Sequence, residues 1–211
     1  MADYKKIYQH YEECFKIQGD NHRGVDWPVE KDVNLRHKVM TELFIKDYPT
    51  KILDFGCGLG HYLDYLKGVS LLGELEYFGA DISEPFIKQC QVKYPHSKFA
   101  QIDILKDNVP FSFDYAVCNG VFTVKKDLQY EVMWQFMVDV ISKLYSQSNK
   151  GIAFNVMSKN VDWERDDLFH VSLDQLTQYL CKNLSRHFVV RSDYGLYEYT
   201  VYVYKTPRGV E

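Results

Sequence analysis

The sequence predicts an α/β fold built on a mostly parallel sheet, and three observations support this prediction. Short runs rich in β-branched and aromatic residues alternate with longer segments whose apolar residues recur at helical spacing. The first run ends in a glycine-rich turn, and several later runs end in an acidic or amide residue. Alternation of this kind places helices on both faces of a parallel sheet. Because only a few residues join the last two runs, that pair should be antiparallel.

The composition limits the kinds of protein that this chain can be. It has 211 residues, 46% of them hydrophobic and 26% charged, as expected for one globular domain. Its net charge of −4 argues against a nucleic-acid substrate. Five cysteines without a Cys-x-x-Cys pair indicate reduced thiols, and no run reaches the ~20 apolar residues of a membrane helix. We therefore expect a cytoplasmic protein that does not act at a membrane, of open oligomeric state.

Residues 1–49 are predicted to form a helical cap or lid, and residues 50–211 the core of the same single domain. Residues 4–17 and 30–48 show helical spacing, with a turn over 18–24 between them. Pro28 favours an extended segment before the second helix, and Pro49 ends that helix.

The core is predicted to contain seven strands. The first contains Ile52, Leu53 and Phe55, and the glycine turn follows it. We expect the other strands at 76–80, 98–102, 113–118, 151–157, 188–191 and 197–204, and helices at 61–67, 83–94, 128–145 and 173–184, with a polar loop at 158–169.

The glycine turn, residues 56–60 (GCGLG), indicates which ligand this fold binds. Glycine accepts positive φ and lets backbone come close to a ligand. A dinucleotide-binding turn needs its third glycine one position later, at His61, and a phosphate loop needs a Gly-Lys-Ser/Thr sequence that is absent. Asp54, just before the glycines, would repel a phosphate. A cationic nucleoside such as S-adenosylmethionine fits these residues.

Acidic residues at later strand ends suit the rest of that ligand. Asp81 follows the second strand, where a carboxylate accepts hydrogen bonds from ribose hydroxyls, although it would also suit a helix cap. Asp103 is a candidate acceptor for the adenine amino group, with Ile82 and Ile104 packed on the ring. A solvated carboxylate is the alternative for Asp103.

The chain resembles the class I S-adenosylmethionine-dependent methyltransferases over residues 51–157. The resemblance lies in four segments: 51–60 (KILDFGCGLG), 77–83 (YFGADIS), 101–105 (QIDIL) and 113–120 (FDYAVCNG). Residues 19–27 (GDNHRGVDW) and 193–204 (DYGLYEYTVYVY) are similar to a bacterial subgroup of small methyltransferases. The resemblance implies a Rossmann-like sheet of seven strands in the order 3-2-1-4-5-7-6, with the last strand antiparallel.

The resemblance also implies a set of cofactor-binding residues. The methionine part is expected near the glycine turn and Asp54, the ribose at Asp81, the adenine at Asp103 and the sulfonium at Asn119. We add Arg36, on the second helix, as a candidate partner of the methionine carboxylate. The predicted cofactor-binding residues are Arg36, Asp54, Gly56, Cys57, Gly58, Gly60, Asp81, Ile82, Asp103, Ile104 and Asn119.

Candidates for catalysis and acceptor binding are less specific, because a sulfonium methyl group is already activated and needs no catalytic dyad. His61, His170 and Asp162 are possible bases. The alternative for His61 is a helix-start side chain in solvent, and His170 and Asp162 fit the more usual role of solvated loop residues. Trp27, Asn155 and Tyr194 are candidate acceptor-binding residues. The seven histidines lack metal-ligand spacing such as His-Glu-x-x-His, so no metal site is predicted.

These observations predict an enzyme that transfers a methyl group from S-adenosylmethionine to an oxygen or nitrogen of a small polar molecule. A role in bacterial cell-surface or specialised metabolism is a secondary expectation. The alternatives are a nucleotide-cofactor oxidoreductase on a similar sheet and a methyltransferase-like module without catalytic activity.

Overall fold

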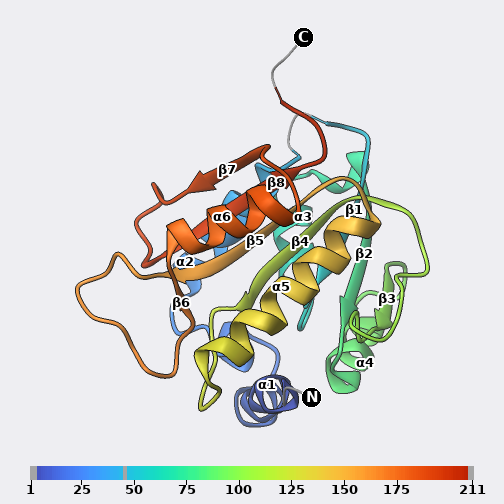
Figure 1. Ribbon diagram of the computed structural model, residues 1–211. Helices are drawn as coiled ribbons and strands as arrows, with labels where there is room; N and C mark the ends of the chain where they lie inside the picture. Colours follow the sequence, from blue (N-terminus) through green and yellow to red (C-terminus); the bar gives the residue numbers. More distant parts are fainter. Residues whose placement is uncertain (1–3, 45–46, 209–211) are drawn as a thin grey trace.

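A single mixed sheet forms the centre of the molecule in the computed structural model, which describes residues 4–44 and 47–208 (Figure 1). The strand order is β3-β2-β1-β4-β5-β8-β7, with the short β6 paired to β5. β8 is antiparallel to both β5 and β7, and the other pairs are parallel. The strands are β1 (Thr50–Phe55), β2 (Leu75–Asp81), β3 (Lys98–Gln101), β4 (Phe113–Phe122), β5 (Ser148–Ser158), β6 (His170–Val171), β7 (Phe188–Arg191) and β8 (Glu198–Tyr204).

The predicted strand order is confirmed, since the expected sixth and seventh strands correspond to β7 and β8. β6 was not predicted, because two residues between a polar loop and a helix carry no periodic signal. Its His170 and Val171 pair in parallel with the end of β5.

Helices cover both faces of the sheet, as expected (Figure 1). One buried cluster contains residues of α5 and α6, and the other contains residues of α2, α3 and α4. No helix in the described part of the chain is long and apolar enough to cross a membrane. The helices are α1 (Lys5–Gln18), α2 (Glu30–Thr41), α3 (His61–Gly68), α4 (Glu84–Lys93), α5 (Tyr130–Gln147) and α6 (Leu173–Asn183), with 3₁₀ turns η1 (His22–Val25) and η2 (Leu72–Glu74).

The predicted end of the second helix at Tyr48 is wrong, because α2 ends at Thr41. The next backbone hydrogen bonds are of the tighter i→i−3 kind, from Leu43 to Met40 and from Phe44 to Thr41. Leu43 and Phe44 are nevertheless fully buried. Because these two residues are buried, the helical spacing of apolar residues continues past Thr41, and the prediction from that spacing was too long.

The two halves of the predicted cap differ in position. α1 crosses the end of the sheet near the loops that follow β4 (Figure 1). α2 instead packs on a face of the sheet, where Val39 and Met40 belong to the same buried cluster as Leu63 of α3. Thus α2 is part of the helical layer, while α1 and η1 cover the strand ends.

β4 is longer than predicted, because it continues to Phe122 through an irregular segment. Its register against β5 shifts between Cys118 and Phe122, and Gly120 within the shift has a φ of 80°. A bulge of this kind changes the direction of the neighbouring side chains. It places Asn119 and Val121 at the end of the sheet that α1 covers.

We predict that Leu63→Ala lowers the free energy of unfolding by about 2–5 kcal/mol, because Leu63 is fully buried and truncation leaves a cavity. Val92→Ala is the matched control: Val92 lies on α4 but is 80% exposed, so its loss should stay within about 0.5 kcal/mol. Urea unfolding of both variants tests this. Equal losses would contradict the assignment of Leu63 to the core.

Candidate functional site

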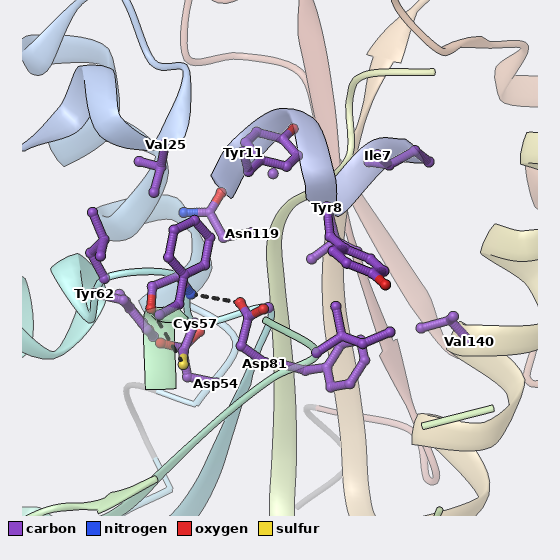
Figure 2. Close-up of a pocket in the computed structure, with 18 of the residues that line it drawn as sticks. Ile7, Tyr8, Tyr11, Val25, Asp54, Cys57, Tyr62, Asp81, Asn119 and Val140 are labelled. Atoms are coloured by element: carbon purple, nitrogen blue, oxygen red, sulfur yellow. Dashed lines mark hydrogen bonds between the residues drawn. The ribbon is translucent and has the colours of Figure 1, made fainter. Parts of the chain in front are cut away.

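A cavity of about 160 Å³ lies where β1, β2 and β4 end, under α1 (Figure 2). Its floor comes from the glycine turn and the strand ends, and its roof from α1 and the segment after η1. The lining residues include Tyr4, Ile7, Tyr8, Tyr11, Val25, Trp27, Val33, His37, Asp54, Gly56, Cys57, Gly58, His61, Tyr62, Asp81, Ile82, Asp103, Ile104, Asn119, Gly120, Val121, Phe136 and Val140.

The glycine turn brings backbone to the cavity surface. Gly56 has a φ of 73°, and a Cβ there would lie only 2.4 Å from Val121. The amide groups of Gly56 and Cys57 both donate to the carbonyl of Ala80, at 2.8 and 3.1 Å. The turn is therefore attached to β2, and a side chain at position 56 would have no room.

Asp81 is 7% exposed and joins two loops at the cavity floor. One carboxylate oxygen accepts from the amide of Gly58 at 2.9 Å, and the other accepts from the amide of Ser83 at 2.9 Å. Burial raises the pKa of Asp81 to about 6, and these backbone hydrogen bonds oppose the increase. Since a carboxylate has about four acceptor positions, acceptor capacity remains for a ligand.

Asp54 is 2% exposed and accepts a 2.6 Å hydrogen bond from the hydroxyl of Tyr77. Burial raises the pKa of Asp54 to about 7, against the lowering effect of that hydrogen bond. Near neutral pH the carboxyl group therefore holds its proton for much of the time. A cation placed beside it would favour the charged form.

Asn119 lines the cavity at the bulge of β4 (Figure 2). Both its amide nitrogen and its amide oxygen are buried, and neither has a hydrogen-bond partner among the described residues. Buried polar groups are nearly always paired, and this amide leaves a donor and an acceptor open at the cavity.

The structure also brings Asp103, Ile82 and Ile104 to the cavity wall. Asp103 accepts from the hydroxyl of Tyr4 at 2.7 Å and pairs with Lys106 at 2.5 Å. Burial favours a higher pKa for Asp103, but these partners outweigh it and lower the pKa. Asp103 stays charged and connects α1 to the strand ends.

His37 is a cavity residue that sequence reasoning missed. It is buried, and its Nδ1 has no partner among the described residues. Its ring lies 5.2 Å from that of Tyr62 and 6.0 Å from that of Trp27, centroid to centroid. Burial lowers the pKa of His37 to about 3, so the ring is neutral. Its helical spacing from Val33, which also lines the cavity, was the available signal.

Arg36, one position earlier, lies outside the set of cavity-lining residues. Its guanidinium pairs with Glu198 on β8, with N···O distances of 2.7 to 3.0 Å. Glu198, also missed from the sequence, is 2% exposed and further accepts from Asn155 at 3.0 Å. Asn155 in turn accepts from the amide of Gly120 at 2.8 Å. These contacts form a chain from α2 to the bulge of β4.

Tyr194 belongs to the same buried group, since its hydroxyl lies 3.4 Å from Glu198 and 2.9 Å from Thr200. Of the three predicted acceptor-binding residues, only Trp27 lines the cavity. Its ring lies against Gly120, where a Cβ would come within 2.7 Å of it, and Arg36 lies 5.0 Å from the ring centroid.

The three base candidates occupy different positions. His61 lines the cavity and lies 3.2 Å from Asp20; burial lowers its pKa, against the raising effect of Asp20. His170 is buried between two backbone groups: its Nδ1 lies 2.6 Å from the carbonyl of Ser158, and its Nε2 accepts from the amide of Arg165. Asp162 is exposed in the loop after β5 and is not a cavity residue.

Comparison with known proteins relates this chain to the methyltransferases. Residues 53–138 match a family described as a methyltransferase domain. A Mycobacterium tuberculosis protein, Rv1506c, whose name assigns it provisionally to the methyltransferases, is 30% identical over 161 residues, or 74% of this chain and 94% of the relative. An uncharacterised Rickettsia prowazekii protein is 34% identical over 110 residues, or 49% of this chain and 41% of that protein.

Two solved structures share the fold. The magnesium protoporphyrin IX methyltransferase of Synechocystis, crystallised with bound S-adenosylhomocysteine, superimposes with a TM-score of 0.63 at 17% identity, over 97% of this chain and 98% of that one. A Leishmania major S-adenosylmethionine-dependent methyltransferase superimposes with a TM-score of 0.65 at 13% identity, over 97% and 85%.

We predict opposite outcomes for the two strand-end asparagines. Asn155→Ala should lower the free energy of unfolding by about 1–3 kcal/mol, because it leaves the buried amide of Gly120 without an acceptor and removes one donor to Glu198, which keeps its pair with Arg36. Asn119→Ala removes a side chain without protein partners and should change it by less than about 0.5 kcal/mol. Chemical denaturation of the ligand-free variants measures both. A larger loss for Asn119→Ala would mean that its amide serves the fold.

Proposed function

We propose, on the premise that this chain belongs to the class I S-adenosylmethionine-dependent methyltransferases, that its cavity binds the cofactor and that the enzyme methylates a small polar metabolite. The acceptor atom in this proposal is oxygen or nitrogen. The observation that carries the cofactor site is the pair of buried polar side chains Asn119 and His37, which have atoms without a partner in the described part of the chain. They lie beside two carboxyl groups whose pKa values burial raises.

The residues present fit this cofactor. Asp54 and Asp81 would gain from a neighbouring positive charge, which a sulfonium and an ammonium group supply. Asn119 can both donate and accept a hydrogen bond. The apolar wall formed by Ile104 and Val140 suits a flat aromatic base.

We assign roles along the cavity accordingly. Asp81 would accept hydrogen bonds from the ribose hydroxyls, and Asp103 and Ile104 would meet the adenine. Gly56 and Gly58 would contact the methionine part through their backbone. We place His37, rather than Arg36, at the methionine end, because His37 lines the cavity and Arg36 pairs with Glu198.

Positioning and exclusion of water are the contributions that we assign to the chain itself. The cofactor, when bound, supplies a methyl group already activated by its sulfonium. The α1 residues Tyr8 and Tyr11 lie over the cavity (Figure 2). Together with Trp27, which also lines the cavity, they would limit the entry of water. Of the base candidates we retain only His61, which lines the cavity; the ring nitrogens of His170 are both engaged.

A small acceptor in a bacterial cytoplasm is the finer part of the proposal. The net charge of −4 argues against a broad electrostatic attraction to nucleic acid, and the five cysteines are free thiols. The Mycobacterium and Rickettsia relatives are bacterial proteins, which supports a bacterial setting. A role in cell-surface or specialised metabolism is our proposal within that setting.

The direct test incubates the protein with S-adenosylmethionine and a library of polar metabolites, and measures S-adenosylhomocysteine together with a product heavier by one methylene unit. Catalysis predicts both signals for the same metabolites. Cofactor binding without product across O- and N-acceptors would favour the non-catalytic alternative, and NAD(H) binding in its place would favour the oxidoreductase.

We predict that Asp81→Ala weakens S-adenosylmethionine binding by about 1–3 kcal/mol, the scale of lost hydrogen bonds to a charged group. Asp162→Ala, in an exposed loop, should leave the affinity unchanged. Titration calorimetry on variants shown by circular dichroism to be folded makes the comparison. Equal affinity for wild type and Asp81→Ala would remove the ribose assignment.

We also predict that cofactor binding releases protons at about pH 6.5. The pKa of Asp54 is about 7 without ligand, and an approaching cation lowers it, so the carboxyl group loses its proton. Binding enthalpies should then differ between buffers of different ionisation enthalpy, and affinity should rise as the pH increases through this range. Asp54→Asn should reduce the buffer dependence, whereas Asp162→Asn should not. A buffer-independent enthalpy in the wild type would contradict the mechanism.

A further inference from the structure

A second group of reactive side chains lies beside the cavity and outside the site described above. His10 and Cys14 are one helical turn apart on α1, and Asp26 follows η1 with a left-handed φ of 58°. The Nε2, Sγ and carboxylate atoms of these residues all lie within 4.8 Å of one another. Nε2 of His10 is 2.7 Å from the Asp26 oxygen and 3.7 Å from the Cys14 sulfur.

The Nε2 atom of His10 therefore lies next to two groups that require opposite protonation states of it: the Asp26 carboxylate needs a donor, and the Cys14 thiol needs an acceptor. If Nε2 carries a proton, it donates to Asp26 and leaves the Cys14 thiol without a strong acceptor. If Nε2 carries a lone pair, it can accept from the thiol but then faces the lone pairs of the carboxylate. A divalent cation removes this conflict, because an imidazole nitrogen, a thiolate and a carboxylate all act as lone-pair donors to it.

We propose that His10, Cys14 and Asp26 form a binding site for a divalent cation of the zinc type. Imidazole and thiolate together favour zinc over the hard cations magnesium and calcium. Residues four apart on a helix share one face, which suits the first two ligands. Ligand bonds of about 2.0 Å to nitrogen or oxygen and 2.3 Å to sulfur place tetrahedral ligand atoms roughly 3.3–3.6 Å apart. The 3.7 Å sulfur–nitrogen separation is close to this.

The Asp26 oxygen must move away from Nε2 by about half an ångström for this nitrogen–oxygen pair to reach such a separation. Its side chain is 42% exposed, and that of His10 is 24% exposed, so this movement is unobstructed by core packing and the site is open to ions from solution. Three protein ligands would leave a fourth position for water or another small ligand.

The position of the site connects it to the cavity. Two of the ligands lie on α1, and the third follows η1, so a bound cation would link the two segments that form the roof. Tyr11, between the two α1 ligands, lines the cavity, and its ring centroid lies 5.4 Å from that of His10. Metal occupancy would thus restrict the roof segments, independently of what the cavity binds.

The test uses the whole protein after treatment with a chelator and a phosphine reductant. Titration with Co²⁺ should give saturable one-to-one binding with a thiolate-to-cobalt absorption band in the near ultraviolet, which Zn²⁺ displaces. Cys14→Ser should abolish the band, while Cys181→Ser, at an exposed cysteine on α6, should retain it. His10→Gln should weaken metal binding at least tenfold, and Zn²⁺ should raise the melting temperature of the wild type but not of this variant.

The proposal would be overturned by several results. These are the absence of saturable binding at micromolar metal, a band that survives in folded Cys14→Ser protein, or a band that Cys181→Ser removes. In each case the His10–Asp26 contact is only a hydrogen bond between α1 and the segment after η1. None of these measurements requires methyl transfer, so they stand apart from the proposed function.

Discussion

The buried carboxylate of Asp81 determines how the loops at the cavity floor are arranged. Its two oxygens accept backbone hydrogen bonds from Gly58, in the turn after β1, and from Ser83, at the start of α4. Hydrogen bonds to an ionised acceptor are roughly twice as strong as neutral ones, so this residue holds two separate chain segments at a fixed distance. The positive φ of Gly56 and the contact of its amide with Ala80 complete the same junction. One side chain therefore both joins the loops of the floor and lines the cavity.

Glu198 has a comparable role on the other side of β4. Burying an ion pair costs desolvation that the pair alone often does not recover. Here the buried carboxylate connects Arg36 of α2 to Asn155 of β5, and Asn155 holds the amide of Gly120. The result is a fixed bulge that presents Asn119 to the cavity. The Arg36–Glu198 pair therefore serves to fix the position of the β4 bulge, rather than to raise the overall free energy of unfolding.

The sequence allowed the fold and the floor of the site to be predicted, because both depend on local signals. Strand–helix alternation indicates a parallel sheet, and parallel strands bring Asp54, Asp81 and Asn119 to one edge without any knowledge of packing. The roof and walls depend on helix rotation instead. On α2 a single position, about 100° of rotation, separates cavity-facing His37 from Arg36, whose partner Glu198 lies 162 residues away.

Other differences have a similar origin. The bonds of His170 to Ser158 and Arg165 depend on the course of a loop, which sequence periodicity does not describe. The group formed by His10, Cys14 and Asp26 contains a single histidine, so it does not match the His-Glu-x-x-His spacing on which the sequence prediction relied.

The attachment of α1 has a consequence for how the molecule fluctuates. Ile7 is its one buried residue, and much of its remaining attachment is polar, as in the contact of Tyr4 with Asp103 and that of Glu12 with Ser83 at 2.7 Å. Detaching this helix would expose less apolar surface than unfolding the whole sheet, so its free energy should depend less steeply on denaturant and be smaller than that of global unfolding. Amide hydrogens in α1 should accordingly exchange with solvent through brief local openings. Amide hydrogens in β1 and β4, at the centre of the sheet, should exchange only through global unfolding.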